Sequence, residues 1–339
     1  MLTSELDYNL PPELIAQTPL EPRDSSRLMV VDRASGSISH HHFYELDCLL
    51  HERDLLVAND SRVIPARLYG RKPSGGRVEL LMLRKLDDLT WRVLVGGRNV
   101  HEIELAVLTE TIVRVTVEPA QDNGDWILHS SVALEPYLPT LGVMPLPPYI
   151  HTPLNDPDRY QTVYARIAGS AAAPTAGLHF TPELIHRLDR SGIGMSFVTL
   201  HVGLDTFKPI DEAVVEEHHI HSEWVEMKDD TVAAIRATRE TGGRVVAVGT
   251  TSARALESAG RKWNSRTPGP LQEFTCLYIT PGYQFGVVDA MITNFHLPRS
   301  TLLAMIGAFT GFDLMQAAYR EAIHERYRFY SFGDAMLIL

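Results

Sequence analysis

Four segments of this 339-residue chain place small or polar residues where a plain connection would not need them. The first, residues 168–183, is rich in Ala and Gly, which let the backbone approach a ligand closely. It ends in Thr181-Pro182-Glu183, which predicts a helix with Thr181 as its N-cap. A helix N-terminus beside such a loop can bind a carboxylate. The segment matches neither a GxGxxG nor a Walker loop, so in isolation a tightly packed structural turn explains it better.

The second segment, residues 245–257, runs from an apolar stretch through Gly249-Thr250-Thr251-Ser252 into a predicted helix. Ligands of open α/β sheets bind at such carboxyl ends of strands, where helix amides and hydroxyl groups can hold a carboxylate. Ordinary N-capping by Thr251 or Ser252 explains the pattern equally well.

The third segment, residues 293–301, again leads a turn into a predicted helix. His296 and Arg299 in this segment suit a proton carrier and an anion clamp. Because a lone histidine is more often structural, the segment by itself does not establish a site.

The fourth region combines residues 201–209 with residues 216–223, which together contain four histidines. A structural zinc site usually includes cysteines, and no H-E-x-x-H is present, so we expect no metal. His219 and His221 alternate as on a strand and would face one side together with Glu223. This favours acid–base chemistry or substrate contact, and a solvated strand face is the alternative.

The elements that position these segments change in character along the chain. Between residues 65 and 141, short alternating runs separated by turn residues predict a small antiparallel barrel or sandwich. A proline-rich connection follows, and after it strands alternate with helices, as in a layered sheet-and-helix domain. Individual expectations include a short helix over 11–17, a helix from Ser252 and a strand over 274–279.

The net charge of −11 argues mildly against a nucleic-acid partner, because phosphate contacts require Lys and Arg. Residues 62–98, however, contain nine basic and three acidic side chains, a local charge of +6. An acidic protein with one basic segment can still bind a polyanion. On sequence alone, a solvated charged face on a small sheet is the better explanation.

Cellular location is indicated by the cysteines and by the chain's ends. Cys48 and Cys276 are far apart and predict two reduced thiols rather than a disulfide framework. The acidic N-terminus lacks the bases and apolar run of a signal peptide, and the apolar stretch 302–309 is too short to cross a bilayer. We therefore expect a soluble cytoplasmic protein with no membrane partner.

Taken together, these segments resemble the S-adenosylmethionine:tRNA ribosyltransferase-isomerase family of queuosine biosynthesis. The matching stretches follow the family's order over nearly the full length, and no motif is missing. They are residues 7–17 (DYNLPPELIAQ), 59–67 (NDSRVIPAR), 164–181 (YAR to FT), 201–203 (HVG), 219–223 (HIHSE), 248–251 (VGTT), 293–298 (TNFHLP) and 327–336 (YRFYSFGDAM).

The resemblance implies a reaction in which the ribosyl group of S-adenosylmethionine moves to the aminomethyl group of a 7-deazaguanine at the tRNA wobble position. The sugar becomes an epoxycyclopentanediol, so the product is epoxyqueuosine, and adenine and methionine are released. S-adenosylmethionine is then a co-substrate, no prosthetic group is needed, and a monomer is expected. The implied fold is mixed α/β: a large sheet-and-helix domain (residues 1–62 and 145–339) with an inserted small antiparallel β-barrel domain (residues 63–144).

This chemistry needs a base for the amine and for the carbon beside the sulfonium, a donor for departing adenine, and a pocket for the flipped-out base. We expect S-adenosylmethionine to contact the first two segments, through Gly169, Ser170, Thr175, Gly177, Thr181, Gly249, Thr250, Thr251 and Arg254. Proton transfer is expected from His201, Asp205, His219, His221, Glu223 and His296, in an order that the sequence does not assign. Contacts to tRNA are expected from Arg62, Arg67, Arg71 and Lys72.

Two other classes of protein compete with this interpretation. A non-catalytic RNA-binding module is disfavoured by the net charge and by the absence of RRM and KH signatures. A methyltransferase is disfavoured because no GxGxG loop follows a strand near the start. The products discriminate, since a methyltransferase releases adenosylhomocysteine and a binding module releases nothing.

Overall fold

A computed structural model describes residues 1–97, 99–106, 112–120, 125–203, 209–265 and 268–339. The chain divides into two compact units. The larger unit contains residues 1–61, 148–167 and 173–339, and the smaller contains residues 62–147 and 168–172. The larger unit therefore resumes at residue 148 rather than at the expected 145, and the return of residues 168–172 to the smaller unit was not expected.

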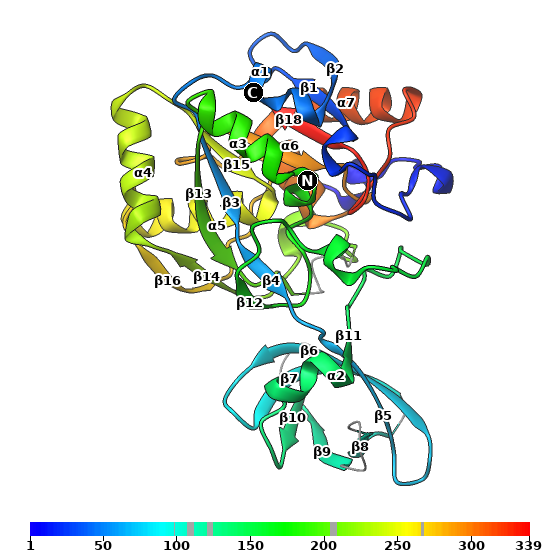
Figure 1. Ribbon diagram of the computed structural model, residues 1–339. Helices are drawn as coiled ribbons and strands as arrows, with labels where there is room; N and C mark the ends of the chain where they lie inside the picture. Colours follow the sequence, from blue (N-terminus) through cyan, green and yellow to red (C-terminus); the bar gives the residue numbers. More distant parts are fainter. Residues whose placement is uncertain (98, 107–111, 121–124, 204–208, 266–267) are drawn as a thin grey trace. The chain divides into compact units, whose positions relative to one another are not determined.

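A nine-stranded mixed sheet forms the centre of the larger unit (Figure 1). Its strand order is β16-β14-β13-β3-β15-β17-β18-β1-β2, and β13, β3, β15 and β17 run parallel to one another. In the order of the sheet, the strands span Leu271–Thr275, Glu223–Met227, Gly194–Leu200, Leu55–Asn59, Val245–Val248, Ala290–Asn294, Ala335–Ile338, Arg27–Val31 and Ile38–His42.

Helices cover both faces of the parallel strands, which explains why β15 is apolar throughout and why β3 and β17 carry polar residues only at their carboxyl ends. Leu56, Val246 and Ile292 lie in one buried cluster with residues of α1 (Leu46–Leu49) and α3 (Pro182–Arg190). On the opposite face, α5 (Thr250–Trp263) packs against β3, β13 and β15 (Figure 1). This unit also contains α4 (Asp229–Glu240), α6 (Thr301–Thr310) and α7 (Phe312–His324).

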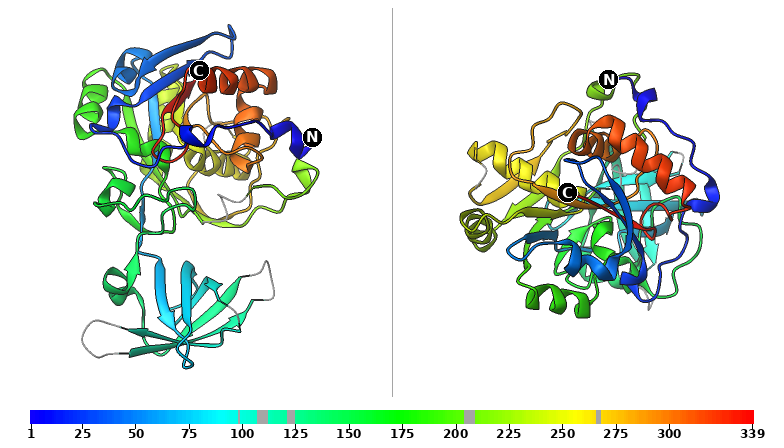
Figure 2. Two further views of the ribbon diagram at one scale, coloured as in Figure 1. Left: turned by 90° about the vertical axis from the view of Figure 1, so that its right-hand side faces the viewer. Right: turned by 90° about the horizontal axis from the view of Figure 1, so that it is seen from above.

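The two ends of the chain meet in this sheet. Strand β1 pairs in parallel with β18, and the amide of Arg33 donates to the carbonyl of Leu339. Figure 2 shows the N-terminal segment, in blue, beside α7 and the C-terminal strand, in red. Strands near both ends of the chain are therefore part of the larger unit's central sheet.

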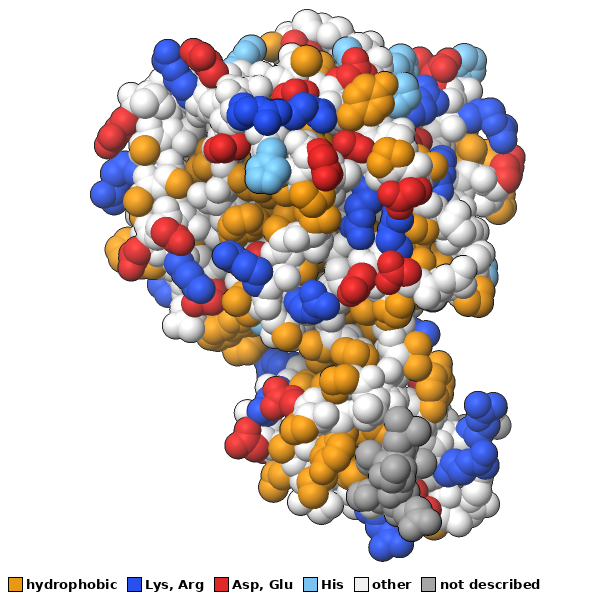
Figure 3. Space-filling model, viewed as in Figure 1, with side chains coloured by type: hydrophobic (Ala, Val, Ile, Leu, Met, Phe, Trp, Pro, Cys, Tyr) orange, Lys and Arg blue, Asp and Glu red, His pale blue; other side chains and the backbone are white. Residues whose placement is uncertain are grey.

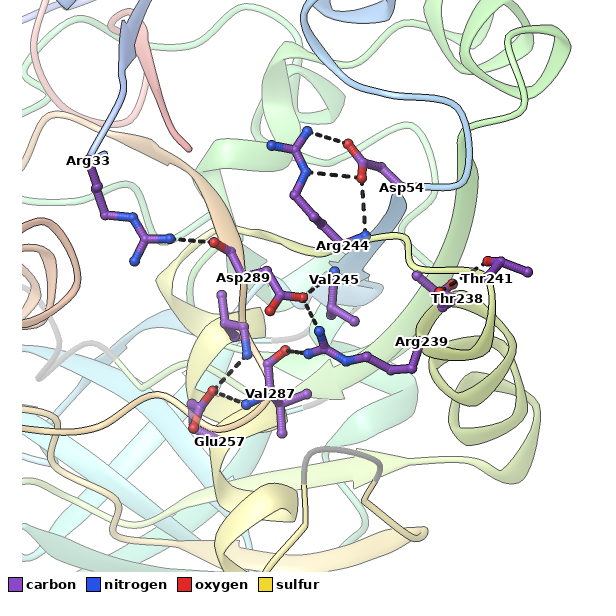
Figure 4. A network of polar contacts seen from close by, with 11 residues as sticks. Arg33, Asp54, Thr238, Arg239, Thr241, Arg244, Val245, Glu257, Val287 and Asp289 are labelled. Carbon is purple, nitrogen blue, oxygen red and sulfur yellow. Dashed lines mark hydrogen bonds and ion pairs between the residues drawn. The ribbon is translucent and has the colours of Figure 1, made fainter. Parts of the chain in front are cut away.

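Hydrogen bonds and ion pairs of polar side chains connect the amino ends of β3, β15 and β17 (Figure 4). Asp54, which precedes β3, accepts hydrogen bonds from Arg244 Nη2 at 2.5 Å and Nε at 3.1 Å. Asp289, which precedes β17, accepts from the Val245 amide at 2.8 Å and from the Arg239 guanidinium. This network holds the strands in register at the end opposite to the polar loops singled out in the sequence.

The smaller unit is a closed antiparallel barrel. Its strands follow the order β5-β6-β7-β10-β9-β8, and β8 pairs back onto β5 through Arg71 and Glu104. A Cβ at Gly70 would lie 2.4 Å from Ile103 Cγ2, so only glycine allows this close approach of β5 and β8. The predicted mixed α/β fold with an inserted β-barrel is confirmed. The strands span Arg67–Arg71, Arg77–Lys85, Thr90–Gly96, Trp126–Ser130, Ile112–Pro119 and Glu102–Ala106, and a short helix α2 (Leu138–Leu141) follows them.

Several local predictions were wrong. The helix expected over 11–17 is a single 3₁₀ turn, Pro12–Leu14, because Ile15 instead bridges to Phe329. The strand expected over 274–279 ends at Thr275, where its pairing with β14 ends. Helix α5 begins at Thr250 rather than at Ser252.

Among the described residues, no single helix is both long and apolar enough to span a membrane. Helices α6 and α7 reach the necessary length and composition only together, and they are bent by 115° relative to each other.

Candidate functional site

A pocket that encloses about 630 Å³, including space open to solvent, lies at the carboxyl edge of the parallel strands, within the larger unit. Strands β15 and β17 end beside it, and parallel sheets bind ligands at this edge. The lining residues are Tyr149, Ala173, Pro174, Thr175, Ala176, Val202, Gly249, Thr250, Thr251, Thr293, Asn294, Phe295, His296, Leu297, Ser300, Leu302, Tyr330 and Ser331.

The N-terminus of α5 opens onto this pocket. Gly249 precedes the helix with a φ of +90°, a backbone conformation that favours glycine, and its Cβ position would lie 3.4 Å from Ala176. No side-chain hydrogen bond caps this helix within the described chain, so the alternative role of Thr251 or Ser252 as N-cap is wrong. Uncapped first-turn amides at the positive end of a helix dipole suit a carboxylate.

Asn294, the last residue of β17, joins three segments at the pocket. Its side chain is 2 % exposed. Its Oδ1 accepts from the hydroxyl of Thr175 at 2.9 Å. Its Nδ2 lies 3.1 Å from Nε2 of His179 and donates to the carbonyls of Tyr330 at 3.2 Å and Asp334 at 3.4 Å. One carboxamide therefore fixes two separate loops around the site.

His296 is held from both sides at the pocket wall. Its Nε2 lies 2.7 Å from the Thr293 hydroxyl, its amide donates to the Tyr319 hydroxyl at 3.0 Å, and its carbonyl accepts from the Tyr8 hydroxyl. Burial lowers the pKa of His296 to about 3. Its imidazole is therefore neutral across the physiological range and serves as a hydrogen-bond partner rather than a strong base.

Asn59, Asp60 and Ser61 form the corner at which β3 ends. Asn59 Nδ2 donates to the Leu200 carbonyl at 2.9 Å and to the Thr251 hydroxyl at 3.3 Å, which ties β3 to β13 and to α5. Asp60 accepts from Thr199 Oγ1 at 2.7 Å and pairs with Arg166 at 2.8 Å. These bonds give the NDSR segment of the sequence a positioning role at the carboxyl edge.

His201 follows β13 directly, next to the pocket residue Val202. Its buried Nδ1 has no hydrogen-bond partner in the part of the chain that the structure describes. Desolvation lowers the pKa of His201, and the Asp60 charge opposes that shift. A neutral imidazole with one unengaged nitrogen can accept a proton.

Of the expected proton carriers that the structure describes, only His296 lines the pocket, and His201, His219, His221 and Glu223 do not. Glu223 is buried, and its carboxylate pairs with Arg254 at 2.6 Å and accepts from the Gly203 amide at 2.9 Å. Arg254 also donates to the carbonyl of His221. His219 is exposed, and the strand predicted over 219–223 is wrong because β14 begins only at Glu223. Asp205 lies outside the described residues.

Only some of the expected S-adenosylmethionine contacts lie at the pocket. Thr175, Gly249, Thr250 and Thr251 line the pocket. Thr181 is the N-cap of α3, as predicted, and accepts from the Leu184 amide at 3.1 Å. The other five expected residues are not among the lining residues: Gly169 and Ser170, which belong to the smaller unit, and Gly177, Thr181 and Arg254.

Gly177 has a structural reason for being glycine. A Cβ there would lie 2.1 Å from the Tyr164 hydroxyl and 2.8 Å from Thr162 Cγ2. The small residues of this segment therefore serve close packing in part, as the sequence alone suggested.

The expected tRNA contacts all belong to the smaller unit. Arg62 and Arg71 are exposed, Arg67 pairs with Glu79 at 3.2 Å, and Lys72 is half-buried. Arg71 lies directly opposite Arg77 across β5 and β6, a pair of like charges that fits a polyanion. On the larger unit, the face seen in Figure 3 mixes Lys and Arg with Asp and Glu rather than carrying one large basic area.

One group with metal-ligand spacing occurs among the described residues. Glu321, His324 and Glu325 bring their ligand atoms within 4.8 Å of one another at the end of α7. The group contains none of the residues expected in the site, and exposed acidic groups of this kind are common without an ion.

Several lining residues were not predicted from the sequence, among them Tyr149, Thr293, Asn294 and Tyr330. Thr293 and Asn294 lie in the TNFHLP segment, for which only His296 was predicted to act in proton transfer. Tyr330 lies in the YRFYSFGDAM stretch and has a φ of +72°, which no property of the sequence indicates.

Comparisons with known proteins extend over both units. The profile of the queuosine biosynthesis protein family matches residues 3–338. A protein from Symbiobacterium thermophilum named S-adenosylmethionine:tRNA ribosyltransferase-isomerase is 51% identical over 343 aligned positions, covering 100% of both chains. The crystal structure of an S-adenosylmethionine tRNA ribosyltransferase from Thermotoga maritima is 40% identical, with a TM-score of 0.57 over 99% of this chain and 100% of that chain.

Proposed function

Because the chain belongs to the queuosine biosynthesis protein family, we propose that it transfers and isomerises the ribosyl group of S-adenosylmethionine onto 7-aminomethyl-7-deazaguanine in tRNA. The acceptor is the wobble base, the product is epoxyqueuosine, and adenine and methionine leave. The observation that carries this proposal is the family match over nearly the whole chain, together with a pocket at the carboxyl edge of the sheet.

The methionine end of S-adenosylmethionine is assigned to the N-terminus of α5. Its carboxylate would accept hydrogen bonds from the uncapped amides of the first turn, with Thr250 and Thr251 at the pocket wall. Arg254, which was expected to contact S-adenosylmethionine, already pairs with Glu223. The backbone amides are therefore the better-supported anchor.

Proton abstraction is assigned to His201. The reaction must remove a proton from the attacking ammonium and from the carbon beside the sulfonium, so a base must be neutral before it acts. The lowered pKa of His201 satisfies this condition, and its Nδ1 is unengaged among the described residues.

Stabilisation of the leaving adenine is assigned to His296 and Thr293. When the bond between ribose and adenine breaks, the electron pair stays on adenine, and a hydrogen-bond donor lowers the cost of that charge. The imidazole and the hydroxyl, 2.7 Å apart at the pocket wall, can offer one donor hydrogen to a ligand while bonding to each other.

Recognition of tRNA is assigned to the smaller unit, through Arg62, Arg67, Arg71 and Lys72. A local charge of +6 over residues 62–98 supports phosphate contacts despite the net charge of −11. The proposal also includes a cytoplasmic monomer that uses S-adenosylmethionine as co-substrate and needs no prosthetic group.

The test incubates the purified protein with S-adenosylmethionine and an anticodon stem-loop carrying the aminomethyl-deazaguanine base. Mass spectrometry follows the small molecules and the digested nucleosides. We expect adenine and methionine to appear in step with epoxyqueuosine. Adenosylhomocysteine would identify a methyltransferase instead, and intact S-adenosylmethionine with a bound stem-loop would favour a non-catalytic RNA-binding protein.

A further inference from the structure

Tyr330 has an unusual backbone conformation at the pocket. Its φ of +72° lies in the left-handed region, and it is the only aromatic residue with positive φ in the described parts of the chain. Bulky side chains avoid this region unless the surroundings impose it. Here the Tyr330 amide donates to the Phe295 carbonyl at 3.1 Å, and its carbonyl accepts from the Gly333 amide at 2.9 Å and from Asn294 Nδ2.

A second tyrosine lies against this ring. The ring centroids of Tyr149 and Tyr330 are 4.6 Å apart, and their planes are inclined by 45°. The Tyr149 hydroxyl lies 2.7 Å from Ser331 Oγ, which fixes the ring of Tyr149 relative to the backbone next to Tyr330. Both tyrosines line the pocket, where they make an aromatic wall.

A purely structural role explains this arrangement poorly. If the chain needed only the left-handed turn here, glycine would form it without strain. If it needed only a side chain to fill space, an ordinary backbone conformation would serve. The surrounding hydrogen bonds maintain an unfavourable conformation and keep Tyr330 at the wall of the pocket, which Thr293 and His296 also line.

We propose that Tyr330 and Tyr149 bind a purine-type heterocycle by stacking, while neighbouring polar groups contact its edge. This inference rests on the proposed function, which supplies two such rings, the adenine of S-adenosylmethionine and the deazaguanine of tRNA. Aromatic side chains bind flat bases in this way because every base has a π-face, and stacking contributes substantially to base affinity.

The test compares Tyr330→Leu with Tyr330→Phe, which keeps the ring and removes only the hydroxyl. Calorimetry measures binding of S-adenosylmethionine, of adenine alone and of methionine alone, with no turnover required. In a second arm, at saturating S-adenosylmethionine, the KM is measured for the stem-loop carrying the aminomethyl-deazaguanine base. Thermal unfolding of each variant checks that the fold is intact.

If the wall binds adenine, Tyr330→Leu weakens S-adenosylmethionine and adenine binding by about tenfold, while methionine binding and Tyr330→Phe stay within about twofold of the parent. If it binds deazaguanine, those affinities hold and the KM for the stem-loop rises by about tenfold instead. The inference is overturned if Tyr330→Leu changes neither, or if Tyr330→Phe loses as much as Tyr330→Leu.

Tyr149→Leu and Tyr149→Phe provide an independent pair of variants with the same expected pattern, and they decide the question if Tyr330→Leu does not fold. Failure of the proposed function is separate, because it appears as absence of adenine release by the parent protein. The calorimetric arm still reports on the aromatic wall in that case.

Discussion

The hydroxyl of Thr175 donates to Oδ1 of Asn294 over 2.9 Å, joining residues that are 119 positions apart in the chain. Through this bond the small-residue loop after β12 (Ile167–Ser170) is attached to the end of β17, at the wall of the pocket. The Asn294 amide group simultaneously serves the C-terminal loop, through the carbonyls of Tyr330 and Asp334.

Replacing Asn294 with alanine should therefore lower the free energy of unfolding more than removing any one of its hydrogen-bond partners. The variant leaves several buried polar groups unsatisfied, each at about 1–3 kcal/mol, so we expect a loss of about 2–4 kcal/mol in the free energy of unfolding. Thr175→Val removes a single bond and should cost about 1 kcal/mol, and Thr175→Ser, which keeps the hydroxyl, should cost less. Urea denaturation measures all three, and equal losses for Asn294→Ala and Thr175→Val would contradict the assignment of Asn294 as the common anchor.

Gly249→Ala tests the proposed carboxylate anchor at α5. The substitution strains a backbone with φ of +90° and places a methyl group 3.4 Å from Ala176. We expect a loss of about 1–2 kcal/mol in stability and a raised KM for S-adenosylmethionine, because the first turn of α5 shifts.

Gly311→Ala is the matched control for this change. Gly311 precedes α7 with a φ of +88° and a ψ of 139°, close to the 90° and 157° of Gly249, nothing lies within 4 Å of the added Cβ, and the residue does not line the pocket. It should lose about 1 kcal/mol in stability with an unchanged KM. A raised KM in both variants would mean that backbone strain, rather than the α5 terminus, controls substrate binding.

Arg244→Ala should reduce stability without changing the chemistry. Asp54 is 2 % exposed, and the variant leaves its carboxylate buried without the guanidinium. Because Arg244 is partly exposed and Asp54 keeps the amides of residues 51 and 244 as donors, the loss should be about 1.5–3 kcal/mol, whereas the exposed pair between Lys262 and Glu273 should be worth less than about 1 kcal/mol. Since the Asp54 network lies at the amino ends of the strands, kcat of the folded fraction should equal that of the parent. A large fall in kcat at full folding would count against this separation.

The local parts of the site could be predicted from the sequence, and the parts built from distant segments could not. Thr250 and Thr251 were found because strand, glycine, hydroxyl residues and helix follow one another directly. The contacts of Asn294 join positions 115 and 119 residues away, and no periodicity reports such pairings. The strain at Tyr330 likewise depends on bonds to Phe295 and Gly333 that only the folded chain reveals.

The fold, too, could be predicted where its signals are local in the sequence. Alternating strands and turns predicted the barrel, and strand–helix alternation predicted the layered domain. Glu223 and Arg254 were expected in catalysis and ligand binding because of the segments in which they lie, and the structure pairs them with each other at 2.6 Å. The sequence therefore shows where a charged residue lies in an otherwise apolar or small-residue segment, but only the folded structure shows which residue it pairs with.

The double variant Arg71→Ala with Arg77→Ala tests the basic segment of the barrel. These side chains lie opposite each other on β5 and β6 and are exposed. We expect weaker binding to modified and unmodified stem-loops alike, and a slope of log affinity against log salt that is smaller by about 1–2. Arg114→Ala, which removes an exposed partner of Glu104 on the same barrel, is the control. If the double variant keeps the parent's salt dependence, these arginines do not contact phosphate.

Acid should destabilise the larger unit through His179 and His296. Burial lowers the pKa of both rings to about 3, with Arg328 and Arg23 adding to the effect at His179. Below the unfolded pKa of about 6.5, the unfolded chain takes up a proton at each ring while the folded chain does not. Stability is thus fully present above that pH and falls on acidification by about 1.4 kcal/mol per pH unit for each histidine.

His296→Gln should therefore reduce the slope of unfolding free energy against pH by about 1.4 kcal/mol per unit between pH 6 and 5, measured by urea denaturation at each pH. His324→Gln is the matched control, because the side chain of His324 is 79 % exposed and should leave the slope unchanged. An unaltered slope in His296→Gln would mean that this imidazole is protonated in the folded protein. In that event His296 would act as a charged acid toward the leaving adenine, rather than as the neutral partner assigned to it here.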